Sequence, residues 1–300
     1  MWNRLSTSDV SYNAMQIKRV GIIGSGIMGS GIAECAARNG YEVVVRSRSQ
    51  STADALLAGI EKSLGKQVEK GKLGAGEVDA ILSRMTATSD FSILADCDLV
   101  IESVLEDLQT KKHLFLELDR ICPDSTILAT NTSTLPVIEL AMETGRPEKV
   151  CGIHFFNPAT VMKLVEIVRP ITVSSDTIES AKEFARSCAK TPVEVRDQAG
   201  FVVNALLFPY LNNAIRLLEQ GVASLEDIDT SMKEGCGFPM GPFALLDLIG
   251  LDTSLSILDA LYEEYKDPNY AAVPLLRRMV SAELLGKKSG RGFYDYHDGK

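Results

Sequence analysis

His154 and Glu166 form the pair of residues with the clearest chemical potential in this sequence. His154 ends the apolar segment 150–154, and the Asn157-Pro158 dipeptide after it is typical of a turn. Glu166 lies inside a second apolar segment, 164–168, where an unpaired carboxylate would be costly. A turn between the two segments would bring the carboxylate to one imidazole nitrogen, so that the other nitrogen could exchange a proton with a substrate hydroxyl. The pattern alone equally allows an isolated core histidine and an unrelated glutamate.

The other two of the three histidines are weaker candidates, because His113 lies in the polar pattern of a predicted surface helix and His297 lies near the C-terminus. Two polar residues have positions that suit substrate binding. Ser133 ends the Asn131-Thr132-Ser133 segment after a predicted strand, and Asn204 interrupts an apolar run. The Ser133 segment could equally cap a helix, and Asn204 could equally bond to its own helix neighbours.

A glycine motif indicates a dinucleotide site. It follows a predicted strand, 19–23, and opens a predicted helix, 27–39, which is the context that phosphate binding requires. The first glycine permits a tight turn, the second lets the backbone approach a pyrophosphate, and the third lets helix and strand pack closely. A turn that merely happens to be rich in glycine is the alternative. The motif consists of Gly24, Ser25, Gly26, Ile27, Met28 and Gly29.

The next predicted strand ends at Arg46-Ser47-Arg48. A site selective for NAD usually has Asp or Glu there, which accepts a hydrogen bond from the ribose 2′-hydroxyl. A serine hydroxyl flanked by two guanidinium groups suits the 2′-phosphate of NADP instead, since arginine can bond a phosphate with two N–H groups. We therefore predict NADP as the preferred cofactor. The alternatives are that the two arginines are ordinary solvated charges, or that both cofactors are used.

The order of predicted elements indicates an α/β fold of Rossmann type, a doubly wound and mainly parallel sheet followed by a smaller all-helical domain. Strands are predicted at 19–23, 42–46, 98–102, 126–129, 150–153, 164–168 and 193–195, with helices between them. After Gly200 the pattern is helical only, beginning with 201–219. We divide the chain into an N-terminal extension (1–15), a dinucleotide-binding domain (16–198) and a helical C-terminal domain (199–300).

Composition limits the partners. The formal net charge of -9 disfavours nucleic acid and anionic membrane, and no segment is long and apolar enough to cross a bilayer. The six cysteines are scattered without a CxxC pair, which is typical of buried free thiols in a reducing compartment. We expect a cytoplasmic protein without a metal site.

Taken together, the motifs resemble the 3-hydroxyacyl-CoA dehydrogenase family over residues 17–297. The resemblance is carried by the glycine motif, the Asn131-Thr132-Ser133 segment, and the segments 154–158, 162–166, 200–204, 239–242 and 286–294. It implies that His154 is a general base, that Glu166 orients it, and that Ser133 and Asn204 hydrogen-bond the substrate. The standalone length resembles the 3-hydroxybutyryl-CoA enzymes, which interconvert (S)-3-hydroxybutyryl-CoA and acetoacetyl-CoA.

The resemblance implies further contacts. Four residues are similar in position to residues of the family that touch the cofactor: Glu106, Lys111, Ser133 and Lys288. Two others, Ser63 and Lys70, are similar in position to residues that touch coenzyme A. It also implies a homodimer formed through the helical domain. Ser47 departs from the aspartate of many family members, in line with the NADP prediction. Two other classes stay open: a dehydrogenase of a free hydroxy acid or sugar acid on the same fold, and a non-catalytic NADP(H)-binding protein.

Overall fold

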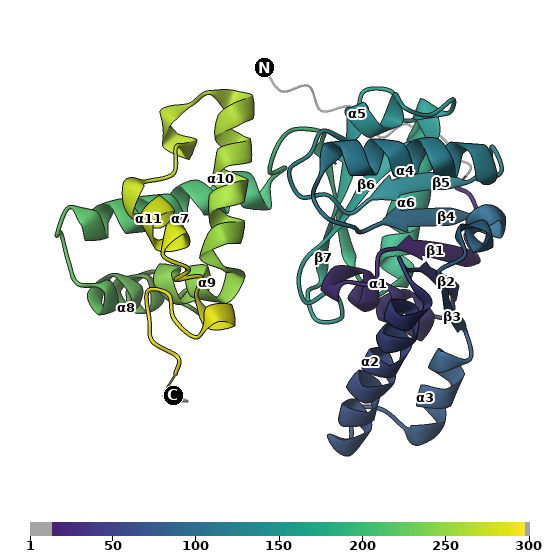
Figure 1. Ribbon diagram of the computed structural model, residues 1–300, viewed down its shortest axis with the longest axis horizontal. Helices are drawn as coiled ribbons and strands as arrows, with labels where there is room; N and C mark the ends of the chain where they lie inside the picture. The colour runs from purple at the N-terminus through teal and green to yellow at the C-terminus, as the bar shows by residue number, and fades with distance from the viewer. Residues whose placement is uncertain (1–13, 298–300) are drawn as a thin grey trace. The chain divides into compact units, whose positions relative to one another are not determined.

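The computed structural model describes residues 14–297, which divide into one compact unit ending at Asp197 and another beginning at Gln198. The first unit is built on a single sheet with helices, and the second is helical (Figure 1). The predicted fold class is thereby confirmed. Most of the predicted extension, residues 1–15, lies outside the described residues.

The sheet of the first unit has eight strands in the order β3-β2-β1-β4-β5-β6-β7-β8. All neighbouring strands are parallel except β6 and β7, which are antiparallel. The strands are β1 (Arg19–Ile23), β2 (Glu42–Arg46), β3 (Met85–Thr88), β4 (Leu99–Glu102), β5 (Ile127–Thr130), β6 (Val150–Phe155), β7 (Leu164–Arg169) and β8 (Thr191–Arg196). The sequence did not predict β3, whereas the direct return from β6 to β7 agrees with the turn expected between these two segments.

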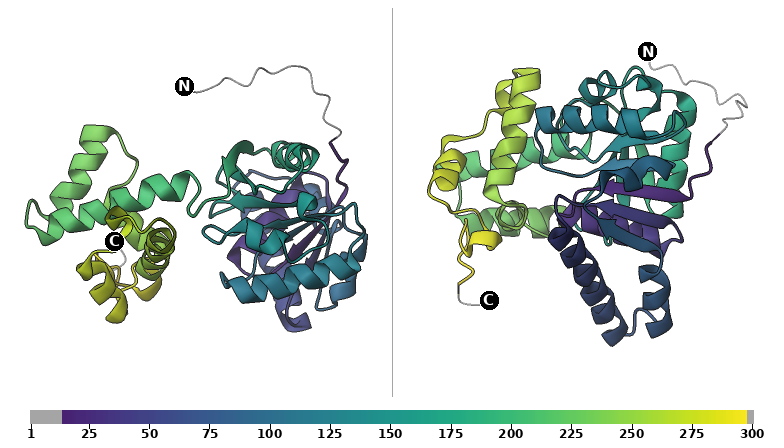
Figure 2. Two further views of the ribbon diagram at one scale, coloured as in Figure 1. Left: turned by 90° about the horizontal axis from the view of Figure 1, so that it is seen from above. Right: turned by 45° about the vertical axis from the view of Figure 1, so that its right-hand side comes forward.

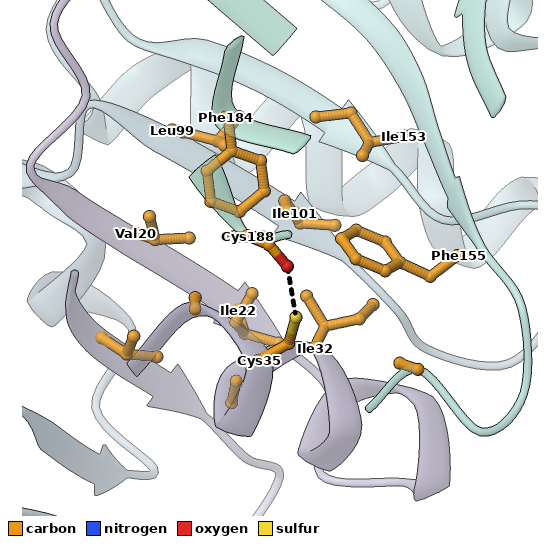
Figure 3. Close-up of a cluster of buried hydrophobic side chains, with 14 of the residues drawn as sticks. Val20, Ile22, Ile32, Cys35, Leu99, Ile101, Ile153, Phe155, Phe184 and Cys188 are labelled. Carbon is orange, nitrogen blue, oxygen red and sulfur yellow. Dashed lines mark hydrogen bonds between the residues drawn. The ribbon is translucent and has the colours of Figure 1, made fainter. Parts of the chain in front are cut away.

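Six α-helices accompany this sheet. Residues of α1, α2 and α6 form one core cluster with side chains from the strands, as Figure 3 shows for the part of it around Ile32 and Phe184. The helices α4 and α5 pack against each other on the opposite face (Figure 1 and Figure 2). Because both faces are covered, the central strands are apolar at successive positions rather than at alternate ones. The helices are α1 (Ile27–Arg38), α2 (Gln50–Glu69), α3 (Ala75–Leu82), α4 (Leu108–Ile121), α5 (Val137–Ala141) and α6 (Ser175–Ser187).

The second unit has its own core, in which α7 and α10 pack against each other around residues such as Leu211, Phe243 and Leu258. Asp247 is buried there and accepts hydrogen bonds from the backbone N–H groups of Phe293 (2.9 Å) and Tyr294 (2.8 Å). These bonds anchor the C-terminal segment on the helices. The α-helices are α7 (Val203–Glu219), α8 (Leu225–Cys236), α9 (Pro242–Ile249), α10 (Leu251–Tyr265) and α11 (Pro274–Ser281). The first of them begins two residues later than the predicted 201–219.

Three further findings bear on the sequence predictions. Within residues 14–297, no helix combines the length and apolar character needed to cross a bilayer. In the same range, no group of three or more His, Cys, Asp or Glu side chains could hold a metal ion. All six cysteines are free thiols, and five are buried; Cys236, at the end of α8, is exposed, so the prediction of buried thiols is wrong for that one.

Candidate active site

His154 and Glu166 touch each other across the antiparallel pair of strands. His154 is the next-to-last residue of β6, and the register places it directly opposite Glu166 of β7. The imidazole Nδ1 lies 2.8 Å from the carboxylate Oε2. Their side chains are only 7% and 1% exposed. The predicted contact is therefore confirmed, and the carboxylate inside the apolar strand has the partner that its burial requires.

Hydrogen bonds from neighbouring loops hold the end of β6 in place. The side-chain Oδ1 of Asn131, the first residue after β5, accepts a hydrogen bond of 2.8 Å from the backbone N–H of Phe155. Beyond β6, the Lys190 Nζ donates to the carbonyl oxygens of Ala159 (2.5 Å) and Met162 (2.9 Å). These hydrogen bonds fix the end of the strand that carries His154 and the loop that follows it. A proton-transfer group needs such a rigid support.

A buried lysine joins two carboxylates near the ends of β4 and β5. Lys111 of α4 is 1% exposed, and its Nζ lies 2.8 Å from Glu102 and 3.2 Å from Glu106. Glu102 also accepts hydrogen bonds from the Thr130 hydroxyl (2.7 Å) and the backbone N–H of Val104 (2.6 Å). The buried charges are therefore compensated within one network, as burial of ions requires.

Glu106 connects this network to Ser133. Its Oε1 accepts hydrogen bonds from the Thr132 hydroxyl and from the backbone N–H of Ser133 (2.9 Å). Burial opposes ionisation, but the charge of Lys111 and these hydrogen bonds outweigh it and lower the pKa of Glu106 below its usual value. Glu106 is thus held as a carboxylate that fixes the Ser133 loop. The buried Lys111 faces Glu106, so its predicted contribution to cofactor binding would act through that carboxylate.

The glycine motif has the geometry of a phosphate cradle. Gly24 has φ +114°, and a Cβ there would lie 2.3 Å from the Ser103 carbonyl oxygen. A Cβ on Gly29 would lie 2.0 Å from the Gly24 carbonyl oxygen, whereas a Cβ on Gly26 would meet nothing within 4 Å. Gly26 is the N-cap of α1, which has no side-chain cap and no acidic residue in its first turn. The open space at this uncapped N-terminus fits the pyrophosphate of a dinucleotide.

The Ser47 hydroxyl has two other hydroxyl groups as its partners. Ser47 is 1% exposed, and its Oγ lies 2.7 Å from Ser25 Oγ and 2.5 Å from Thr52 Oγ1. Ser47, which directly follows β2, thus joins a hydroxyl of the glycine motif to one in the first turn of α2. Arg48 is exposed, and the Arg46 guanidinium lies 5.3 Å from the centre of the Phe91 ring. The arginines, not Ser47, are therefore the groups available for a phosphate.

The remaining predicted residues lie in both units. Ser63 is half-buried on α2, and the exposed Lys70 is the C-terminal cap of the same helix. In the second unit, Asn204 is buried in the first turn of α7, and Lys288 is paired with Asp252 at 2.5 Å. His113 is 72% exposed and beside Glu117, which fits its predicted surface position.

Sequence reasoning missed Glu102, Thr130 and the bracing role of Asn131. Glu102 ends an apolar strand in the same way that Glu166 interrupts one, so the cost of burying a carboxylate would have identified it too. No pattern in the sequence indicates that Asn131 bonds to the backbone of Phe155, because the two residues are distant along the chain.

The architecture is that of a Rossmann-type NAD-binding domain followed by a helical domain. Residues 19–198 match the family model of the 3-hydroxyacyl-CoA dehydrogenase NAD binding domain, and residues 200–296 match the model of the C-terminal domain of the same family. The chain therefore belongs to the 3-hydroxyacyl-CoA dehydrogenase family. The NAD-binding domain indicates a nicotinamide cofactor.

Characterised relatives support this assignment. The chain is 47% identical over 279 residues to a 3-hydroxybutyryl-CoA dehydrogenase of Clostridioides difficile, covering 93% of this chain and 99% of the relative. It is 43% identical over 298 residues to the human mitochondrial hydroxyacyl-coenzyme A dehydrogenase, covering 97% of this chain and 95% of that relative. The crystal structure of (S)-3-hydroxybutyryl-CoA dehydrogenase from Ralstonia eutropha is similar with a TM-score of 0.91 at 39% identity, covering 94% of this chain and 99% of that one.

Proposed function

We propose that this protein interconverts (S)-3-hydroxybutyryl-CoA and acetoacetyl-CoA, with NADP(H) as its preferred cofactor. The observation that carries the proposal is the buried contact of 2.8 Å between His154 Nδ1 and Glu166 Oε2. It joins an imidazole, which can accept and donate a proton, to a carboxylate that can hold its orientation. The names of the bacterial relatives support the short-chain substrate.

In this mechanism a nicotinamide cofactor, when bound, would provide the hydride chemistry. His154 removes the proton of the substrate 3-hydroxyl through Nε2, because Glu166 engages Nδ1. Glu166 holds the ring tautomer and stabilises the imidazolium that forms. Ser133 and Asn204 hydrogen-bond the substrate, and Glu106 keeps the Ser133 backbone in place. In the reverse direction His154 returns the proton to the forming alkoxide.

Coenzyme A recognition is assigned to α2. Ser63 and Lys70 lie on this helix and at its end, where a lysine can neutralise a phosphate of coenzyme A. The dinucleotide pyrophosphate is assigned to the N-terminus of α1, and Glu106, Lys111 and Lys288 are proposed to support the cofactor. Each of these assignments rests on a resemblance in position along the chain to family members and on the chemistry of the side chain.

The preference for NADP rests on Arg46 and Arg48. No carboxylate occupies position 47 to accept from a ribose 2′-hydroxyl, and Ser47 is engaged with Ser25 and Thr52. A 2′-phosphate gains charge-assisted hydrogen bonds from guanidinium groups, whereas a 2′-hydroxyl gains much less. Arg48→Ala should therefore raise the Kd for NADPH by about tenfold while changing that for NADH by less than about twofold. Arg120→Ala, an exposed arginine on α4, is the matched control.

Initial rates test the substrate and the cofactor together. Acetoacetyl-CoA, a longer 3-ketoacyl-CoA and free acetoacetate are each offered with NADPH and with NADH. The proposal expects the highest kcat/KM for acetoacetyl-CoA with NADPH. A faster rate with free acetoacetate would instead identify a dehydrogenase of free hydroxy acids, and tight NADPH binding without turnover would identify a binding protein. A higher kcat/KM with NADH would overturn the cofactor preference alone.

The helical unit is proposed to form a homodimer, and the protein is proposed to act in the cytoplasm. Large apolar side chains are exposed on this unit, notably Leu206, Val222 and Leu248. Exposed apolar surface of this kind favours association of subunits. Light scattering that gives the mass of a single chain would contradict the dimer.

The proposal that the protein acts in the cytoplasm is supported by its free thiols, which fit a reducing compartment.

A further inference from the structure

Two cysteines outside the proposed active site are in contact. Cys35 lies in α1, and Cys188 is the C-terminal cap of α6. The Cys35 Sγ lies 3.6 Å from the carbonyl oxygen of Cys188 (Figure 3). The two side chains also influence each other, because the Cys188 side chain lowers the pKa of the Cys35 thiol and the Cys35 side chain raises the pKa of the Cys188 thiol. Since the Cys35 sulfur contacts the backbone of Cys188 itself, the two residues are close enough to be candidates for a disulfide, which requires a sulfur–sulfur distance of about 2 Å.

Both cysteines line one pocket of about 530 Å³ in the first unit. Its walls also carry Glu77 and four cationic side chains, which are Arg38, Arg84, Lys163 and Lys190. The positive charge is concentrated here although the whole chain has a net charge of -9. Such a cavity attracts small anions. His154, Ser63 and Lys70 do not line it, so this pocket differs from the proposed sites for proton transfer and coenzyme A.

The surroundings divide the two thiols into a stronger and a weaker acid. The hydrogen bond from Cys188 lowers the pKa of Cys35; burial opposes this, while the charges of Lys190 and Arg38 lower it further. The same hydrogen bond, together with burial, raises the pKa of Cys188. Cys97, Cys122 and Cys151 contrast with Cys35, because burial raises the pKa of each of them to between about 11 and about 12. Since the thiolate is the nucleophile, Cys35 is the thiol suited to attack.

We propose that Cys35 and Cys188 form a reversible redox site that reacts with a small anionic disulfide held in the basic pocket. The Cys35 thiolate attacks one sulfur of the disulfide, forming a mixed disulfide and releasing one half as a thiolate. The Cys188 sulfur then attacks the Cys35 sulfur, closing the Cys35–Cys188 disulfide and releasing the second half. The two cysteines lose two electrons and two protons, and the small disulfide gains them as two free thiols.

Glutathione disulfide serves as the anionic probe and cystamine as a cationic one. The full chain is used with Cys236→Ser, which removes the exposed thiol, and peptides are mapped by mass spectrometry. Glutathione disulfide should produce the Cys35–Cys188 disulfide, and dithiothreitol should reverse it. Cys188→Ser, which keeps a hydrogen-bond donor beside Cys35, should instead accumulate a glutathione adduct on Cys35, because no second thiol displaces it. Cys35→Ser should leave Cys188 unmodified.

Charge at the pocket supplies an independent measurement. Lys163→Gln should slow the reaction with glutathione disulfide by about fivefold, the effect of losing one cation near the reacting groups. Lys62→Gln, an exposed lysine of α2 outside the pocket, is the matched control and should not slow it. The proposal is overturned if the Cys188→Ser protein carries no adduct on Cys35, if Cys97, Cys122 or Cys151 reacts first, or if cystamine reacts as fast as glutathione disulfide.

Discussion

Replacing Glu166 by glutamine tests the role of the His154–Glu166 pair with little change of shape. Glutamine has nearly the same volume as glutamate, so the apolar packing of β7 is retained. What changes is the charge and the direction of the hydrogen bond to Nδ1. The amide can donate an N–H to Nδ1, which places the ring proton on Nε2, the atom that has to accept the substrate proton.

The geometry sets the size of the effect. At the observed 2.8 Å, an imidazolium and a carboxylate attract each other by about 6 kcal/mol at an effective dielectric constant near 20. Much of this is offset by the removal of both groups from water, and hydrogen bonds to charged groups contribute about 1.5–3 kcal/mol net. A loss of that size slows the reaction roughly 10- to 150-fold. The wrong tautomer adds to it, since the equivalent change in Ser-His-Asp hydrolases costs about 10⁴-fold. We therefore expect Glu166→Gln to lower kcat by roughly 10²–10⁴-fold.

The assay follows nicotinamide absorbance with acetoacetyl-CoA, together with cofactor affinity by fluorescence and thermal unfolding. Cofactor affinity should change by less than about twofold, because the glycine motif does not depend on Glu166. Glu166→Asp keeps the charge on a shorter side chain and should retain more activity than Glu166→Gln. The exposed Glu183 of α6 provides the control Glu183→Gln. A folded Glu166→Gln protein that keeps more than about one third of wild-type kcat would refute the role given to this pair.

Three more predictions address the elements around the site. Gly29→Ala should lower the free energy of unfolding by roughly 1–3 kcal/mol, because its Cβ would lie 2.0 Å from the Gly24 carbonyl oxygen. The Cβ of Gly26→Ala has open space, so this variant should keep the stability of the wild type and lose affinity for the dinucleotide. Denaturant melts measure the stability of the two variants, and NADPH titrations measure their affinity. If Gly26→Ala and Gly29→Ala lost the same amount of stability, this reasoning would be contradicted. Asn131→Ala should cost roughly 1–3 kcal/mol in urea unfolding by removing the acceptor of the Phe155 N–H, whereas Asn131→Asp, which keeps an oxygen there, should cost less. Because the pKa of Glu106 is lowered on folding, its carboxylate stabilises the fold above an unfolded-state pKa of about 4.3, and this contribution disappears as the pH falls through the folded-state pKa. Wild type should therefore lose stability more steeply in acid than Glu106→Gln, and parallel stability curves would contradict the assignment.

The sequence predicted the central strands because their environment leaves a strong pattern. In β1, β4 and β5 both faces are covered, so each is a short run of apolar residues bounded by turns or polar residues. The strand β3 has the sequence MTAT, in which only Met85 and Ala87 are buried, and it lies at the edge of the sheet. Four residues with two threonines give no apolar run, so the pattern could not separate this strand from a loop.

The sequence allowed site residues to be predicted where the chemical type of one residue does not match that of its neighbours. Glu166 could be identified because a carboxylate inside an apolar strand needs a partner, and Gly24 because the turn needs its positive φ. The partners of Ser47 could not be predicted in this way. Its type suits a phosphate, but its hydroxyl is equally suited to Ser25 and Thr52, and the sequence does not indicate which partner is closer.

The contact between His154 and Glu166 depends on the direction and register of β7. Residues 156–163 connect β6 to β7 and are too few for the crossover of a dozen or more residues that a parallel pair requires, so the pair must be antiparallel. In this arrangement a slip of one residue would move Glu166 to the other face of the sheet. Gly152 lies opposite Val168, and a Cβ at position 152 would come within 2.6 Å of the Val168 Cβ. The glycine therefore permits the close approach of the two strands in the one register that brings carboxylate and imidazole together.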